Sequence, residues 1–121
     1  MSNLTHDVAL LATEWGPRTL LRAQLIEEGL DVRAVDAWPD MRRYLRPGEL
    51  PHLAIVDLQG LPDPDRVLAD LHVLMPPGRV LVLTALGTVT ADRVKRLGFR
   101  VMNRPFEVSE VVATALEAIR S

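Results

Sequence analysis

Residues 53–62 read LAIVDLQGLP and place a lone carboxylate, Asp57, at the end of an apolar run. The run has no alternation of apolar and polar residues, which is typical of a central parallel strand covered on both faces. A carboxylate at the end of a buried strand costs free energy unless a nearby group pairs with it or a reaction uses it. The rest of the chain is therefore expected to provide a partner or a role for Asp57.

Short apolar runs recur along the chain, at residues 8–12, 32–35, 80–83 and 99–102. Between the runs, apolar residues at helical spacing predict helices at 17–28, 38–45, 65–74, 90–97 and 109–120. Strand–helix repeats with right-handed crossovers predict an α/β fold, a doubly wound five-stranded parallel sheet flanked by helices on both faces. The run at 32–35 alternates in polarity, which indicates an edge strand.

Length and composition narrow the class of protein. The 121 residues suit one domain spanning 1–121, and 14 basic against 16 acidic residues leave no basic excess for direct nucleic-acid binding. The absence of cysteine excludes thiolate metal sites and cysteine nucleophiles and fits a reducing compartment. The first residues have neither a basic leader nor a long apolar run. We therefore expect a cytoplasmic protein without membrane contact.

Polar residues follow several of the predicted strands. Asp57 follows 53–56, Thr84 follows 80–83, Arg104 comes shortly after 99–102, and Glu14 comes shortly after 8–12. In doubly wound sheets the functional site lies beyond the carboxyl ends of the strands, where the winding direction reverses. These residues are therefore expected at one edge of the sheet. The simpler roles stay open: an ion pair for Asp57, a turn-capping hydroxyl for Thr84 and a solvated loop position for Glu14.

Three pieces of the sequence carry a family resemblance: LAIV before Asp57, LVLTA around Thr84, and NRPF at 103–106. Together they resemble the receiver domain of two-component response regulators, of the chemotaxis-regulator type. The resemblance implies a flavodoxin-like sheet of order 2-1-3-4-5, a phosphoacceptor at Asp57, phosphoryl-binding roles for Thr84 and Arg104, and a cis peptide before Pro105. It also implies a signalling domain that is not an enzyme. The implied partners are a histidine kinase or phosphotransfer protein and a downstream effector protein, with a homodimer as a further option.

The implied magnesium site departs from the family pattern. Receivers hold the ion with the acceptor aspartate, an acidic pair after the first strand and a backbone carbonyl two residues past the acceptor. Here Ala12 and Thr13 stand at the positions of the acidic pair. The remaining oxygen donors are Asp57, the Gln59 carbonyl and Glu14, a set that predicts a weak or absent magnesium site.

Arg104 is the second departure, because the family has lysine at this position. A guanidinium presents a planar fork suited to a permanent bidentate pair with Asp57, which an ammonium group does not match. Two signalling hypotheses follow. In the first, Asp57 is phosphorylated and the added charge draws in Thr84 and Arg104. In the second, Asp57 and Arg104 are locked together and the domain is a pseudo-receiver that binds a protein partner without phosphoryl chemistry.

A third hypothesis is a flavodoxin-like protein that binds a nucleotide or a flavin at the same strand ends. Phosphate binding of this kind uses a glycine-rich turn that leads into a helix. The first loop, TEWGPRT at 13–19, has a single glycine, and neither common glycine-rich phosphate motif occurs in the chain. Trp15 lies in this loop, and the preferred interpretation is a ring that packs over the loop.

Overall fold

The computed structural model describes residues 6–84 and 91–120. Its five parallel strands form one sheet in the order β2-β1-β3-β4-β5, which confirms the predicted order. The strands are β1 (Val8–Leu11), β2 (Val32–Val35), β3 (Leu53–Asp57), β4 (Val80–Leu83) and β5 (Arg100–Met102). Every residue of β1, β3 and β4 is buried, as expected for strands covered on both faces. The alternating run at 32–35 forms edge strand β2, also as predicted.

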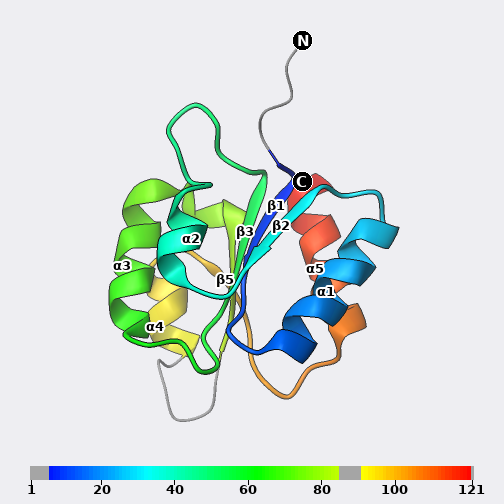
Figure 1. Ribbon diagram of the computed structural model, residues 1–121. Coiled ribbons are helices and arrows are strands. Elements are labelled where there is room, and N and C mark those ends of the chain that lie inside the picture. Colours follow the sequence, from blue (N-terminus) through cyan, green and yellow to red (C-terminus); the bar gives the residue numbers. More distant parts are fainter. Residues whose placement is uncertain (1–5, 85–90, 121) are drawn as a thin grey trace.

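Helices cover both faces of the sheet (Figure 1). One face carries α1 (Trp15–Glu27) and α5 (Val108–Arg120), and the other carries α2 (Trp38–Arg42), α3 (Pro64–Leu74) and α4 (Ala91–Arg96). A short 3₁₀ turn, η1 (Pro77–Arg79), leads into β4. None of the helices within residues 6–84 and 91–120 combines the length and the apolar character needed to cross a bilayer.

Several predicted helix ends were wrong by small amounts. Helix α1 begins at Trp15 rather than at 17, because Pro17 is tolerated within the first turn, where backbone N–H groups have no helical partner. Helix α2 ends at Arg42, although Leu45 remains buried beyond it. Helix α4 begins at Ala91, and the predicted start at 90 lies outside the described residues.

The core consists of two clusters, one on each face of the sheet. Strand residues that pack toward α2, α3 and α4 are Ala9, Leu11, Ala54, Val56, Val80 and Val82. Strand residues that pack toward α1 and α5 are Val8, Leu10, Leu53, Ile55, Leu81 and Leu83. This alternation is the two-residue period of a strand. Asp57, the polar residue of β3, comes after this alternating part, at the end of the strand.

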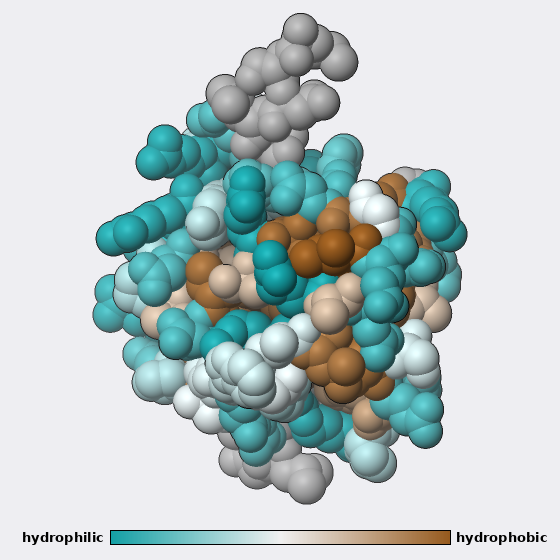
Figure 2. All heavy atoms as spheres, turned by 45° about the vertical axis from the view of Figure 1, so that its right-hand side comes forward, coloured by the Kyte–Doolittle hydropathy of each residue, from teal (hydrophilic) through white to brown (hydrophobic). Residues whose placement is uncertain are grey.

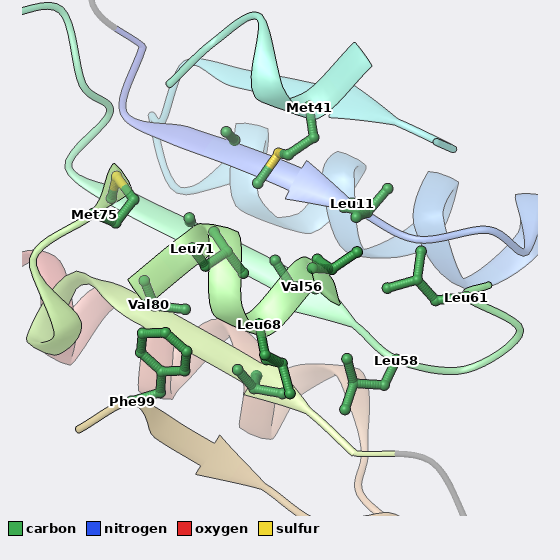
Figure 3. Packing of buried hydrophobic residues seen from close by; sticks show 14 of the residues in the cluster. Leu11, Met41, Val56, Leu58, Leu61, Leu68, Leu71, Met75, Val80 and Phe99 are labelled. Atoms are coloured by element: carbon green, nitrogen blue, oxygen red, sulfur yellow. The ribbon is translucent and has the colours of Figure 1, made fainter. Parts of the chain in front are cut away.

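The outer surface of α1 retains apolar side chains. Figure 2 brings the α1 and α5 side forward and shows brown, hydrophobic atoms gathered among teal, hydrophilic ones. On α1, Trp15 is 72% exposed, Leu20 is 49% exposed and Ile26 is 41% exposed. The domain therefore leaves part of this side uncovered. On the opposite face, buried side chains of α2 and α3 pack over the sheet, as Met41, Leu68 and Leu71 do in Figure 3. Val73 of α3 points away from this core and is 85% exposed.

Candidate functional site

The carboxyl ends of β1, β3 and β4 lie side by side at one edge of the sheet. Leu11 pairs with Val56, and Asp57 pairs with Leu83, so the residues that follow these strands share the edge. Leu83 in turn pairs with Met102 of β5, which brings the segment after β5 to the same place. Asp57 and Thr84 are the two buried polar residues of the described chain, 5% and 7% exposed.

Asp57 and Arg104 form a bidentate ion pair. The Arg104 Nη2 lies 2.6 Å from Asp57 Oδ2, and Nη1 lies 2.9 Å from Oδ1. Nη1 also donates to the Thr84 carbonyl at 2.7 Å. The side chains of Arg104 and Asp57 are 22% and 7% exposed, so little water screens the pair. Two parallel charge-assisted hydrogen bonds give this arrangement both strength and a fixed geometry.

Further contacts hold the pair in place. The Gln59 backbone N–H donates to Asp57 Oδ1 at 2.9 Å, so this oxygen accepts two hydrogen bonds. The Arg104 guanidinium lies over the Phe106 ring, with its central carbon 4.9 Å from the ring centroid, a cation–π contact. The peptide between Arg104 and Pro105 is cis, as the resemblance implied. Among the described residues, every fully buried side-chain nitrogen and oxygen has a hydrogen-bond partner.

Thr84 lies at the site, but its hydroxyl has other partners than Asp57. The hydroxyl donates to Asn103 Oδ1 at 3.0 Å, and its distance to the Met102 carbonyl is 3.4 Å. The Thr84 backbone carbonyl, rather than the hydroxyl, contacts the ion pair through Arg104. The hydroxyl therefore ties the end of β4 to the segment after β5, instead of capping a local turn.

The residues at the implied magnesium position do not fit that ion. The Thr13 hydroxyl donates to the Gln59 carbonyl at 2.8 Å and so engages the backbone oxygen expected to bind metal. Arg18 Nη1 lies 2.9 Å from the Ala12 carbonyl and 3.3 Å from the Thr13 carbonyl, which places a cation beside the positions of the missing acids. Glu14 is exposed and precedes α1 without a side-chain hydrogen bond to the described helix.

Magnesium needs several oxygen ligands in near-octahedral geometry. Among the described residues, the one buried carboxylate, Asp57, is paired with a guanidinium. The carbonyl of Gln59 already accepts a hydrogen bond from the Thr13 hydroxyl. The described residues also contain no group of three or more acidic or histidine side chains arranged to hold a metal ion. Hydrogen-bond donors thus stand where the ion would contact Asp57 and Gln59.

Solved structures of receiver domains resemble this chain over nearly its whole length. The receiver domain of the Francisella response regulator 1452 superposes with a TM-score of 0.77 at 14% identity, over 96% of this chain and 98% of that chain. A CheY-like response regulator receiver domain protein from Methanospirillum hungatei gives 0.77 at 17% identity, over 96% and 94%. The chain has the receiver-domain fold. NtrX from Brucella abortus, solved in complex with ATP, gives 0.77 at 22% identity, over 96% of this chain and 27% of NtrX. No protein-family model and no curated protein matches the sequence.

Within the receiver fold, the structure brings together the three residues expected to converge, Asp57, Thr84 and Arg104. Their phosphoryl-binding roles stay predictions. The interpretation of Trp15 was wrong, because this residue starts α1 and is largely exposed instead of packing over the loop. Sequence reasoning did not find the Arg18 contact, which arises because the first turn of α1 returns the side chain to the end of β1.

Gly60 makes the contact between Thr13 and Gln59 possible. Its φ is +72°, and a Cβ at this position would lie 2.6 Å from Thr13 Oγ1. We expect Gly60→Ala to lower the free energy of unfolding by roughly 2 kcal/mol, of which about 1 kcal/mol comes from the left-handed backbone. Chemical denaturation of the variant in the wild-type and Thr13→Ala backgrounds measures both parts.

The steric part should disappear when Thr13 is alanine, because the clashing hydroxyl is then absent. Gly29→Ala is the matched control, since Gly29 has φ +87° but no atom within 4 Å of the added Cβ. Its cost should be about 1 kcal/mol and the same in both backgrounds. If Gly60→Ala lowered the free energy of unfolding equally in the two backgrounds, the close approach of position 60 to the Thr13 hydroxyl would be contradicted.

Proposed function

We propose that this chain is a receiver-fold signalling module that acts by binding a partner protein, with Asp57 held by Arg104 instead of being phosphorylated. The observation that carries the proposal is the bidentate pair at 2.6 and 2.9 Å. Arg104 supplies at Asp57 the positive charge that a metal ion supplies in magnesium-dependent phosphoryl transfer. Of the two signalling hypotheses, this geometry favours the locked pair.

Phosphoryl transfer to Asp57 would require a free carboxylate oxygen and cations around the transferred group. Oδ1 accepts from the Gln59 N–H and from Arg104, and Oδ2 accepts from Arg104. Moving Arg104 away from both oxygens would leave a largely buried carboxylate without its cation, and the loss of one partner of a buried ion pair costs about 3–5 kcal/mol. This cost supports a module whose state does not depend on phosphorylation.

The exposed apolar side chains of α1 support a role in protein binding. Trp15 is the most exposed of these side chains, at 72%, and aromatic residues such as tryptophan are enriched in protein interfaces. We propose a downstream effector protein as the partner class. A histidine kinase or phosphotransfer protein is required only if Asp57 is phosphorylated, and a homodimer is an alternative assembly. We also propose that the module acts in the cytoplasm, without catalysis of its own and without direct contact to nucleic acid.

The dimensions of the site disfavour a flavin or nucleotide. The cavity beside Asp57 and Arg104 has a volume of about 30 Å³. Pockets that hold small organic ligands measure about 300–1,000 Å³. The volume of the cavity next to the ion pair is therefore about the volume that one water molecule occupies in liquid water.

Magnesium and beryllium fluoride test the proposal directly, because together they mimic a phosphorylated aspartate. We expect amide resonances of Gln59 and Thr84 in the ¹⁵N-labelled chain to stay unchanged at millimolar concentrations of both reagents. Incubation with acetyl phosphate should likewise leave the mass of the protein unchanged. Saturable shifts that vanish in Asp57→Asn would overturn the proposal in favour of a phosphorylated receiver.

A further inference from the structure

A second cavity, away from the ion pair, lies between the start of α2 and the loop that leads into α3. Its volume is about 270 Å³. Its apolar lining consists of Ala37, Trp38, Pro39, Leu61, Pro62 and Val67. Figure 1 shows α2 and α3 on the same side of the sheet. The residues that line the pocket come from the first turns of these two helices and from the loops before them. None of these residues contributes to the contacts of Asp57 and Arg104.

The walls of the pocket are held by the fold. Leu61 and Val67 are buried members of the core cluster, and Figure 3 shows Leu61 among its side chains. The Trp38 indole donates from Nε1 to Asp70 at 3.2 Å, which fixes its ring against α3. Two prolines, Pro39 and Pro62, restrict the backbone at the rim. A cavity with fixed walls binds a partner at a lower entropic cost than one that must first form.

The charged residues at the rim select the kind of occupant. Asp36, Asp63 and Arg66 line the opening, and all three side chains are exposed. The salt bridges found in the described part of the chain involve neither carboxylate. Two carboxylates against one guanidinium leave a net negative rim. A cationic group beside an apolar one is therefore the complementary chemistry.

The volume lies below the range of pockets for small organic ligands and suits a single large side chain. We propose that this pocket receives an aromatic side chain of a partner protein, with a neighbouring basic residue of that partner placed against Asp36 and Asp63. The inference rests on the proposed protein-binding function and adds the chemistry of the partner. Interaction hot spots are enriched in tryptophan, tyrosine and arginine and lie in well-packed pockets.

Three capped dipeptides test this inference on the full chain: acetyl-Trp-Arg-amide, acetyl-Trp-Glu-amide and acetyl-Gly-Arg-amide. The readout is the chemical shift of the Ala37 and Asp63 amides and of the Trp38 indole N–H. We expect saturable shifts with Trp-Arg, binding at least about tenfold weaker with Trp-Glu, and no saturation with Gly-Arg. Comparable binding of Trp-Glu and Trp-Arg would overturn the charge assignment, and no shift with Trp-Arg would overturn the site.

Two variants test the pocket for the aromatic side chain and the acidic residues at its rim separately. Asp36→Asn/Asp63→Asn should bring the affinities for Trp-Arg and Trp-Glu within about twofold of each other. Asparagine suits position 63, because Asp63 has φ +51° and asparagine tolerates the left-handed region. Ala37→Leu should fill the cavity and abolish Trp-Arg binding, and position 37 has extended backbone that accepts a larger side chain. Trp-Arg binding that survives Ala37→Leu would place the dipeptide elsewhere and overturn the inference.

Other occupants give different results. Shifts at the pocket that grow with protein concentration and without dipeptide would indicate a second copy of the chain, and tryptamine binding tenfold tighter than Trp-Arg would indicate a small amine. Either result would overturn the proposal. A response of Gln59 and Thr84 to beryllium fluoride would refute the locked ion pair while leaving the dipeptide result unaffected, so the two proposals fail separately.

Discussion

Arg104→Leu is expected to lower the free energy of unfolding by about 3 kcal/mol, because it leaves the buried Asp57 carboxylate without its cation. The Gln59 N–H would remain as the partner of Oδ1, and Oδ2 would lose its hydrogen bond. Small domains are stable by about 5–15 kcal/mol, so this loss is a large share of the total. Urea denaturation followed by circular dichroism, with a shift of the midpoint at unchanged slope, measures it.

A surface pair provides the control for this prediction. Arg43 and Asp40 lie 3.9 Å apart with side chains 77% and 48% exposed. Arg43→Leu should therefore change stability by no more than about 0.5 kcal/mol. Replacing arginine by leucine would then lower the free energy of unfolding several times more at position 104 than at position 43, because the ion pair at position 104 is shielded from water.

The double variant Asp57→Leu/Arg104→Leu separates the strength of the pair from the cost of leaving one charge alone. Replacing a whole buried ion pair by apolar side chains is often neutral or stabilising. The double variant should therefore be more stable than Arg104→Leu by about 2 kcal/mol. If Arg104→Leu lowered the free energy of unfolding by no more than Arg43→Leu does, Arg104 would not be stabilising the buried Asp57 carboxylate. That result would refute the locked-pair mechanism.

The fold was predictable because its signals are local and repeated. Residues 53–56 and 80–83 are apolar at every position, as expected for short strands covered on both faces. Helix ends were less predictable, because the spacing of apolar residues indicates which residues are buried and does not show where the helical backbone stops. Leu45 shows the difference, because it is buried at helical spacing from Met41 but lies beyond the end of α2.

The convergence of Asp57, Thr84 and Arg104 was predictable because the carboxyl ends of parallel strands share one edge of a sheet. The charge and shape of arginine also favoured a bidentate pair with Asp57. The directions of hydrogen bonds were not predictable. Whether the Thr84 hydroxyl faces Asp57 or Asn103 depends on a side-chain torsion, which the order of residues does not determine.

The contact between Thr13 and the Gln59 carbonyl was also beyond the sequence. Thr13 was recognised only as a missing acid, and its hydrogen bond depends on the path of the loop after β3. Gly60 is the one signal that points to it, because a glycine with positive φ allows the loop to approach the end of β1. Glycine is common in turns of many kinds, so Gly60 points to this contact only when the positions of both loops are known.

Restoring a magnesium site should require changes at three positions rather than two. In Ala12→Asp/Thr13→Asp the acidic pair returns and the Thr13 hydroxyl no longer engages the Gln59 carbonyl, but Arg104 still holds both oxygens of Asp57. Adding Arg104→Lys replaces the fork by a point charge that cannot bind both oxygens side by side. We expect magnesium to bind the triple variant at least about tenfold more tightly than the double variant.

Thermal denaturation with and without magnesium measures this difference. Without the ion, the triple variant should be less stable than wild type, because three carboxylates crowd one partly buried site and Ala12 is only 3% exposed. Saturating magnesium should reverse most of the loss, since an ion that binds only the folded state stabilises it by mass action. The melting temperature of wild type should not respond, and Asp57→Asn should abolish the response of the triple variant. Equal magnesium affinity in the double and triple variants would mean that the missing acids are the whole defect and that Arg104 does not block the site.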